Sequence, residues 1–95
     1  MYMRVTRFQL KQASIGKFQE VTGAAKKVTA TFGGLQHCYS AIDESGNGLM
    51  VAVWESEESA TANLPAVKEA WAGLAEHFDG PPQMSGYTNA ILVKG

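Results

Sequence analysis

The joint between an apolar run and a polar helix start near the middle of the chain constrains its fold most. Residues 51–54, with the sequence VAVW, have the composition of a buried strand, and the acidic segment ESEES follows at once. We expect Ser56 to cap a helix here, with Glu57 and Glu58 in its first turn, where the helix dipole favours negative charge. The chain on each side of the joint also has strand and helix patterns, so the joint predicts a fold of two similar halves.

A strand and a helix are predicted in the first third of the chain. Residues 3–10 have strand character, with Val5, Phe8 and Leu10 as the apolar members. A helix is expected from about residue 15 to residue 32, capped by Ser14, because apolar residues recur there in steps of three and four. The glycine pair that follows is expected to end this helix.

A hairpin is predicted between residues 35 and 54. Residues 35–43 and 49–54 have strand character, and the segment between them contains Asn47 and Gly48. An Asn-Gly pair favours a tight hairpin turn because both residues tolerate positive φ. The second of these strands is apolar on both faces, which indicates a central position in the sheet.

A helix with a break and a final strand are predicted in the last third of the chain. Pro65 lies inside an apolar stripe with helical spacing and cannot donate to the preceding turn, so we expect a kink or a break near Asn63. The Gly-Pro-Pro run at 80–82 ends the helix, and residues 84–93 alternate as a strand. The stripe consists of Ala60, Leu64, Val67, Trp71, Leu74 and Phe78.

The element order β-α-β-β-α-β predicts an α+β, ferredoxin-like fold in a single domain spanning residues 1–95. Both helices would then cover one face of a four-stranded antiparallel sheet. The other face would be left bare, and a large exposed apolar face favours association. We therefore expect a homodimer formed through the sheet, for which a hydrophobic content of 45% supplies the material.

Composition and charge argue against several classes of partner. The net charge is -1, and Lys26 and Lys27 form the only adjacent basic pair, which argues against nucleic acid and against a polybasic membrane anchor. No apolar signal core or membrane-length run is present, so a cytoplasmic location is expected. The single cysteine, Cys38, cannot form an intrachain disulfide, and no spacing of His, Cys, Asp and Glu predicts a metal site.

The strand-to-helix joint also carries a family resemblance. In its length, its element order and the sequence Val53-Trp54-Glu55-Ser56, the chain resembles the dimeric α/β-barrel superfamily and, within it, the antibiotic biosynthesis monooxygenase-like (ABM-like) domains. The resemblance implies two sheets that pair into a barrel across a dimer. It also implies a small aromatic, quinone-like or haem ligand held between sheet and helices.

The haem-degrading branch of the superfamily fits the chain poorly. That branch has an asparagine on its first strand, which residues 3–10 lack, and a tryptophan and a histidine on its second helix. Trp71 and His77 are six residues apart, so they lie on different sides of a helix. We expect His77 to complement the dipole in the last helical turn instead. The resemblance that is left, to the cofactor-free quinone-forming monooxygenases, implies an enzyme without a cofactor.

Four side chains are candidates for ligand binding in such a site. The resemblance implies that Trp54 and Trp71 shape the pocket, although a place in the core is the simpler explanation for each. Asn89 would donate a hydrogen bond to the ligand, and Tyr87 would contact it. These residues permit the chemistry but do not identify the substrate.

Two further side chains, His37 and Tyr39, are the candidates for proton transfer. An imidazole titrates near neutral pH, so His37 is a possible general base, with a hydrogen-bonded histidine in the sheet as the simpler alternative. Cys38 lies next to His37 and therefore points to the opposite face of a strand, which excludes a Cys–His nucleophilic pair. We expect this cysteine to be a small apolar filler.

Three functions are left open by the sequence. An oxygenase acting on a small aromatic or quinone-like molecule leads. A non-catalytic dimeric module, with a ligand-binding or stress-related role, is the first alternative, and an isomerase or decarboxylase, which would need a positioned base, is the second. Arg4 and Arg7 lie on opposite faces of the first strand, and one of them could meet a carboxylate ligand or an acid of a partner chain. A solvated position at a sheet edge is the alternative for both.

Overall fold

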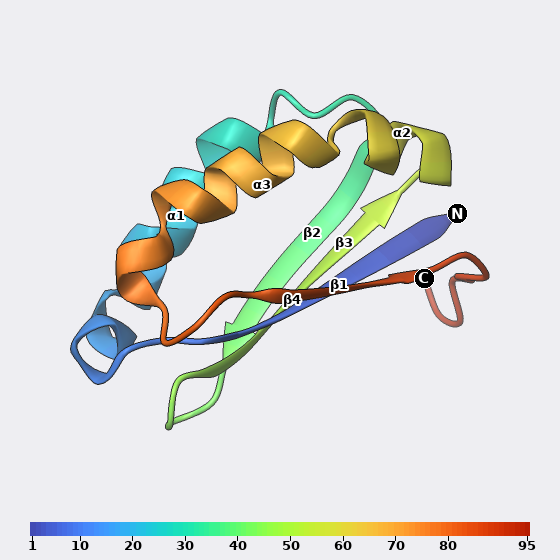
Figure 1. The fold of residues 1–95 in the computed structure, drawn as a ribbon. Helices are drawn as coiled ribbons and strands as arrows, with labels where there is room; N and C mark the ends of the chain where they lie inside the picture. The colour runs from blue at the N-terminus through green and yellow to red at the C-terminus, as the bar shows by residue number, and fades with distance from the viewer.

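Four strands form one antiparallel sheet, and the helices lie together on one face of it (Figure 1). The computed structural model describes all residues from 1 to 95, and the strand order is β2-β3-β1-β4. This order confirms the ferredoxin-like α+β fold and the central position of β3. In chain order the elements are β1 (Tyr2–Gln9), the 3-10 helix η1 (Gln12–Lys17), α1 (Phe18–Thr29), β2 (Leu35–Ile42), β3 (Asn47–Trp54), α2 (Glu57–Ala62), α3 (Leu64–Gly73), the 3-10 helix η2 (Ala75–His77) and β4 (Gln83–Tyr87).

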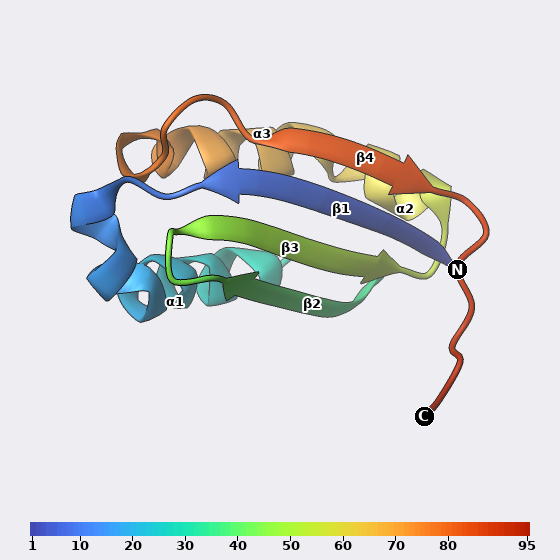
Figure 2. The same ribbon diagram turned by 90° about the horizontal axis from the view of Figure 1, so that it is seen from below.

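The strand register decides which side chains face the helices. Residues directly opposite each other on antiparallel neighbours point to the same face. Ala52 of β3 pairs with Arg4 of β1 and with Cys38 of β2, and these three face the helices. The opposite side of the sheet, which no helix covers (Figure 2), is called the outer face here. It includes Met3, Val5, Arg7, His37, Tyr39, Ala41, Leu49, Val51, Val53, Gln83, Ser85 and Tyr87.

The first helical region differs from the prediction at both ends. The 3-10 helix η1 comes first, and α1 begins only at Phe18 and ends at Thr29. Ser14 was expected to cap an α-helix, but it lies inside η1 and makes no cap hydrogen bond. Gly16 in the same stretch disfavours a regular α-helix because glycine loses the most backbone freedom on folding. Gly34, with φ 86°, then turns the chain into β2.

The hairpin between β2 and β3 is confirmed, but it turns at Gly46 rather than at the Asn-Gly pair. Gly46 has φ 84°, and no residue other than glycine has positive φ, so Asn47 is ordinary strand backbone. Asp43 holds the turn. Its carboxylate accepts hydrogen bonds from the backbone N–H groups of Ser45 and Asn47, both at 2.9 Å, and from the side-chain amide of Asn47 at 3.0 Å.

These hydrogen bonds predict a turn that weakens in acid. The side-chain hydrogen bond from Asn47 is the largest cause that holds the pKa of Asp43 below its ordinary value of 3.8. A carboxyl with a lowered pKa in the folded state stabilises the fold above its unfolded pKa, and this contribution is lost as the pH falls through the folded pKa. We expect Asp43→Asn to be less stable than wild type at neutral pH and to lose less stability between about pH 5 and pH 2. Urea unfolding across that range measures both, and equal acid losses in the two proteins would contradict the prediction.

The second helical region breaks where its proline predicts. α2 ends at Ala62 and α3 begins at Leu64, with Pro65 in the first turn of α3, where its missing N–H costs nothing. The Ser56 hydroxyl accepts a hydrogen bond from the Ser59 N–H at 3.1 Å, which confirms the predicted cap. No helix of the fold is both long enough and apolar enough to cross a membrane.

The last strand is shorter than predicted, because β4 ends at Tyr87 and not near residue 93. Tyr87 pairs with Met3, and β1 begins only one residue before that. A strand at the sheet edge has one neighbour, so the chain beyond Tyr87 has no strand left to pair with and runs past the end of the sheet (Figure 2). Ile91, Leu92 and Val93 are consequently exposed.

The core is small and divided into two clusters. Only 10 of the 95 residues are buried, and none of them belongs to α1. One cluster contains Tyr2, Trp54 and Ala60, and the other contains Leu10, Trp71 and Phe78. The space between these clusters, under the two long helices, is where the candidate site lies.

Candidate functional site

A cavity lies between the sheet and the helices α1 and α3. Its volume is about 60 Å³, and the hollow including the open mouth measures about 600 Å³. Twelve of its 15 lining residues are hydrophobic. We call it the helix–sheet cavity; it is lined by Arg4, Thr6, Ala25, Val28, Thr29, Phe32, Leu35, Cys38, Met50, Ala52, Trp54, Val67, Ala70, Trp71 and Leu74.

Short side chains leave this space open. Ala25 on α1, Ala52 on β3 and Ala70 on α3 all line the cavity. In a close-packed interior, a larger side chain at any of these positions would fill the volume that a methyl group leaves empty. Alanine at these three positions, one in each of the elements around the space, therefore leaves the cavity open.

The two tryptophans line the cavity from different elements. Trp54, at the end of β3, stacks on Phe32 with ring centroids 6.2 Å apart. Trp71, on α3, packs against Phe8 and Phe78 with centroids 5.6 and 5.4 Å away. The aromatic side chains thus fill the space around Phe78 but do not close the cavity beside Trp54.

Two buried hydrogen-bond donors of the cavity have no partner. Arg4 is 8% exposed and its Nη1 makes no hydrogen bond, and the same is true of Nε1 of Trp54, a residue 1% exposed. The guanidinium lies 5.7 Å from the centroid of the Tyr2 ring, a cation–π contact. No acidic residue lines the cavity. Of the two arginines that the sequence places on opposite faces, Arg4 is the one facing the helices, while Arg7 is exposed on the outer face.

The candidate residues for proton transfer lie outside the cavity. His37 and Tyr39 are exposed on the outer face, with their rings stacked 6.4 Å apart. Strand parity groups His37 with Leu35, but a bulge between them reverses the alternation, so that Leu35 lines the cavity and His37 faces away. Tyr87 is also on the outer face, and Asn89 follows β4 at the surface. These four residues are therefore not gathered with the two tryptophans.

Cys38 is the one ionisable group besides Arg4 in the cavity wall. The residue sits on the edge strand β2 and is exposed as a whole, but its side chain faces the cavity. Burial there raises the pKa of the Cys38 thiol from its ordinary value of 9.0. A thiol of this kind stays protonated at neutral pH and is a poor nucleophile.

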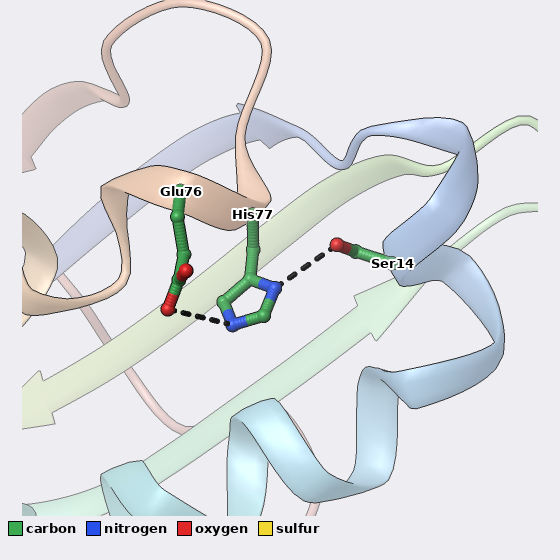
Figure 3. A network of polar contacts seen from close by, with 3 residues as sticks. All are labelled: Ser14, Glu76 and His77. Carbon is green, nitrogen blue, oxygen red and sulfur yellow. Dashed lines mark hydrogen bonds and ion pairs between the residues drawn. The ribbon is translucent and has the colours of Figure 1, made fainter.

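A separate cluster of polar side chains joins the two 3-10 helices, with Ser14 on η1 and with Glu76 and His77 on η2 (Figure 3). The Ser14 hydroxyl and Nδ1 of His77 are 2.9 Å apart, and Nε2 of His77 is 3.7 Å from the carboxylate of Glu76. Glu76 is 81% exposed, so its contact with His77 contributes little to stability. None of these residues lines the helix–sheet cavity. His77 therefore joins η2 to η1, and it lies in the last turn of η2, the position expected for it from the sequence.

Removal of this serine hydroxyl should weaken the fold. Ser14 is 6% exposed, and Ser14→Ala leaves Nδ1 of His77 without its partner. We expect a loss of about 1–2 kcal/mol in the free energy of unfolding, the usual result when a buried polar atom loses its hydrogen bond. Ser45→Ala is the matched control, because the Ser45 side chain is exposed and makes no hydrogen bond, and it should change stability by less than about 0.5 kcal/mol. Equal urea midpoints for Ser14→Ala and Ser45→Ala would contradict the joining role.

Known structures share this architecture. No family model matches the chain, and no curated protein is significantly similar to it in sequence. SnoaB, a cofactor-independent oxygenase of Streptomyces nogalater, has a TM-score of 0.77 at 15% identity, over 99% of this chain and 97% of its own. The monooxygenase from the gene ActVA-Orf6 of Streptomyces coelicolor, solved in complex with nanaomycin D, has a TM-score of 0.75 at 20% identity, over 99% and 91%.

The fold is that of the ABM-like domains. A candidate antibiotic biosynthesis monooxygenase of Deinococcus radiodurans adds to this, with a TM-score of 0.77 at 16% identity over the whole of both chains. At such identities the likeness establishes the ABM-like fold, while activity has to be argued from the site itself. No group of three or more His, Cys, Asp or Glu side chains in the chain could hold a metal ion.

Proposed function

We propose that this protein is a small oxygenase of the ABM-like type that binds an aromatic or quinone-like molecule in the helix–sheet cavity and uses no resident cofactor. The observation that carries the proposal is an apolar cavity with two buried donors that lack partners. The likeness in fold to a cofactor-independent oxygenase and to a monooxygenase solved with nanaomycin D supports it.

The residues of the cavity suit a substrate that supplies its own electrons. A phenol and dioxygen give a para-quinone and water: the ring loses four electrons, one oxygen atom enters the ring, and the other leaves as water. The cavity wall contains no general base, since its ionisable groups are Arg4 and Cys38. The substrate therefore has to be acidic enough to lose its proton without one. The N–H groups of Arg4 and Trp54 are the donors that the cavity offers to an anionic oxygen of the bound molecule.

A ligand would have to widen the cavity. A volume of about 60 Å³ holds about two water molecules, whereas pockets for small molecules measure about 300–1,000 Å³. None of the residues of α1 is buried, so this helix can move away from the sheet at little cost in packing. The cavity is also open at its mouth, which allows it to widen in this way.

The alternatives differ in what they require of the cavity. An isomerase or a decarboxylase needs a positioned base, and the cavity wall offers no free imidazole or carboxylate for that role. A non-catalytic ligand-binding module needs no base, and the same observation favours it as the second candidate. His37 and Tyr39 serve as catalytic groups only if the substrate binds at the outer face instead.

Turnover of simple phenols tests the proposal. The protein is incubated with 1-naphthol and related phenols in aerated buffer, while oxygen uptake and quinone absorbance are followed. We expect oxygen uptake with at least one phenol, lost in Ala70→Phe, which fills the cavity, and kept in Ala66→Phe, which adds the same ring on the exposed side of α3. Phenol binding without oxygen uptake would instead establish the binding module, and absence of binding would refute both.

A homodimer formed through the outer face belongs to the same proposal. The chain exposes 6295 Å², whereas a compact monomer of 10.2 kDa is expected to expose about 5300 Å². Tyr39 and Tyr87 on the outer face are 70% and 50% exposed. Pairing of two outer faces would cover this surface. A cytoplasmic location stays a prediction, supported by the one free thiol, which suits a reducing compartment.

A further inference from the structure

Arg4 is a buried cation that the protein does not neutralise. The residue is 8% exposed, and its Nη1 is buried without a hydrogen bond. The one contact between an acidic and a basic side chain joins Glu76 to His77, away from the cavity. A guanidinium stays charged at any physiological pH, so Arg4 cannot relieve its burial by losing a proton. An unpaired charge in an apolar wall is strongly unfavourable, and an anion bound beside it would offset much of this cost.

The second unpaired donor lies next to the first. Arg4 pairs in register with Ala52, and Trp54 is two residues further along β3, which makes Arg4 and Trp54 diagonal neighbours on the face toward the helices. The backbones of such neighbours lie about 7–8 Å apart. Two long side chains at this spacing can both contact one small group between them. Both unpaired atoms are donors, and no buried side-chain acceptor lacks a partner. The missing group is therefore an acceptor.

The surroundings of Arg4 hold the guanidinium in place. Its Cζ lies 5.7 Å from the centroid of the Tyr2 ring. Tyr2 in turn lies over Gly86 of β4, where any side chain would collide with the Tyr2 hydroxyl. Gly86 thus leaves space for the Tyr2 ring, which the Arg4 guanidinium contacts. A cation–π contact orients a guanidinium and leaves its N–H edges free to bind an anion.

We infer that the helix–sheet cavity recognises a small apolar carboxylic acid, whose carboxylate pairs with Arg4 and accepts a hydrogen bond from Nε1 of Trp54. The inference rests on the proposed function and narrows it: the substrate would be a phenol that also has a carboxylate, and this carboxylate, rather than the phenolic oxygen, would pair with Arg4. The planar fork of a guanidinium matches the two oxygens of a carboxylate, a match that a neutral carbonyl or a single phenolate oxygen does not provide. The cavity volume of about 60 Å³ has room for a carboxylate, and the apolar body would extend between α1 and α3 toward the mouth.

A matched pair of ligands tests the charge directly. Isothermal titration of the wild-type protein with 2-naphthoate and with 2-naphthamide compares the same ring with and without the carboxylate. A phenolate-forming ligand of similar size, 1,8-dihydroxynaphthalene, and a neutral quinone, 2-methyl-1,4-naphthoquinone, complete the set. We expect the acid to bind at least tenfold more tightly than the amide and more tightly than the phenol.

Arginine variants then assign the preference to one residue. We expect Arg4→Gln to abolish the preference for the acid over the amide, and Arg4→Lys to keep part of it, since lysine retains the charge without the fork. Arg7→Gln removes the same charge from the outer face of the same strand, and it should leave the preference intact. Should Arg4→Gln not fold, Arg4→Lys and the ligand pair on the wild-type protein still decide the matter.

The outcomes separate this inference from the proposed function. Equal affinity for acid and amide, or a phenol that binds more tightly than the acid, would overturn the carboxylate and leave an aromatic-binding cavity standing. A preference that survives in Arg4→Gln would overturn the role of Arg4. No binding of any of the four ligands would overturn the inference and the proposed binding site together.

Discussion

Val51→Glu is expected to convert the proposed dimer into monomers. Val51 lies on the central strand β3 with Val5 and Tyr39 as its register partners, so it occupies the middle of the outer face. In a two-fold symmetric interface each substitution occurs twice, and two unpaired carboxylates would be buried near the axis. A cost of about 3 kcal/mol or more corresponds to a dissociation constant raised at least about 100-fold.

Sedimentation velocity over a range of protein concentrations measures this change. Ala66→Glu introduces the same charge on the exposed side of α3 and should leave the dissociation constant unchanged. Circular dichroism at the same concentrations checks that both variants are folded, since a small domain can depend on its dimer for stability. A wild-type protein that sediments as a monomer at every concentration would refute the sheet-to-sheet dimer.

The parts of the fold that the sequence predicts correctly are those set by local chemistry. Ser56 caps α2 because its hydroxyl reaches an N–H three residues away, and Pro65 breaks the helix because it lacks its own N–H. Such interactions involve residues within one turn of each other. The central position of β3 is likewise predictable from local sequence, because its own residues are apolar on both faces.

The errors come from interactions between distant segments. The length of β4 depends on where β1 begins, and nothing in residues 84–93 contains that information. The face of His37 depends on one bulge against β3, which moves every following side chain of β2 to the other side. The hydroxyl of Ser14 caps no helix, and its partner is His77, which is 63 residues away in the sequence.

One signal for the site was present in the pattern of β1. At the start of this strand the residues facing the helices are the polar Arg4 and Thr6, while the apolar Met3 and Val5 lie on the outer face. This inverts the usual alternation of a sheet covered on one side. Local rules tend to fail at functional sites, and an arginine alternating with apolar neighbours on a strand is such a failure. This pattern can be interpreted only once the face of the sheet that the helices cover is known.

Trp54→Ala is expected to remove a large part of the stability of the fold. Trp54 is 1% exposed, belongs to one of the two small core clusters, and stacks on Phe32. Loss of a fully buried aromatic side chain costs about 3–5 kcal/mol, a large share of the total stability of a small domain, which is about 5–15 kcal/mol. Urea unfolding followed by circular dichroism at one protein concentration gives the change in the free energy of unfolding.

Trp54→Phe separates the packing role of this residue from the role of its N–H group. Phenylalanine keeps an aromatic ring against Phe32 and removes Nε1, a donor without a partner. Relief of an unsatisfied donor offsets part of the lost contact area, so we expect a loss below about 2 kcal/mol, well under that of Trp54→Ala. Affinity for a carboxylate ligand should nevertheless fall at least about tenfold, the equivalent of one hydrogen bond to a charged group. A Trp54→Phe protein as unstable as Trp54→Ala, with unchanged affinity, would show that the indole N–H stabilises the fold and does not await a ligand.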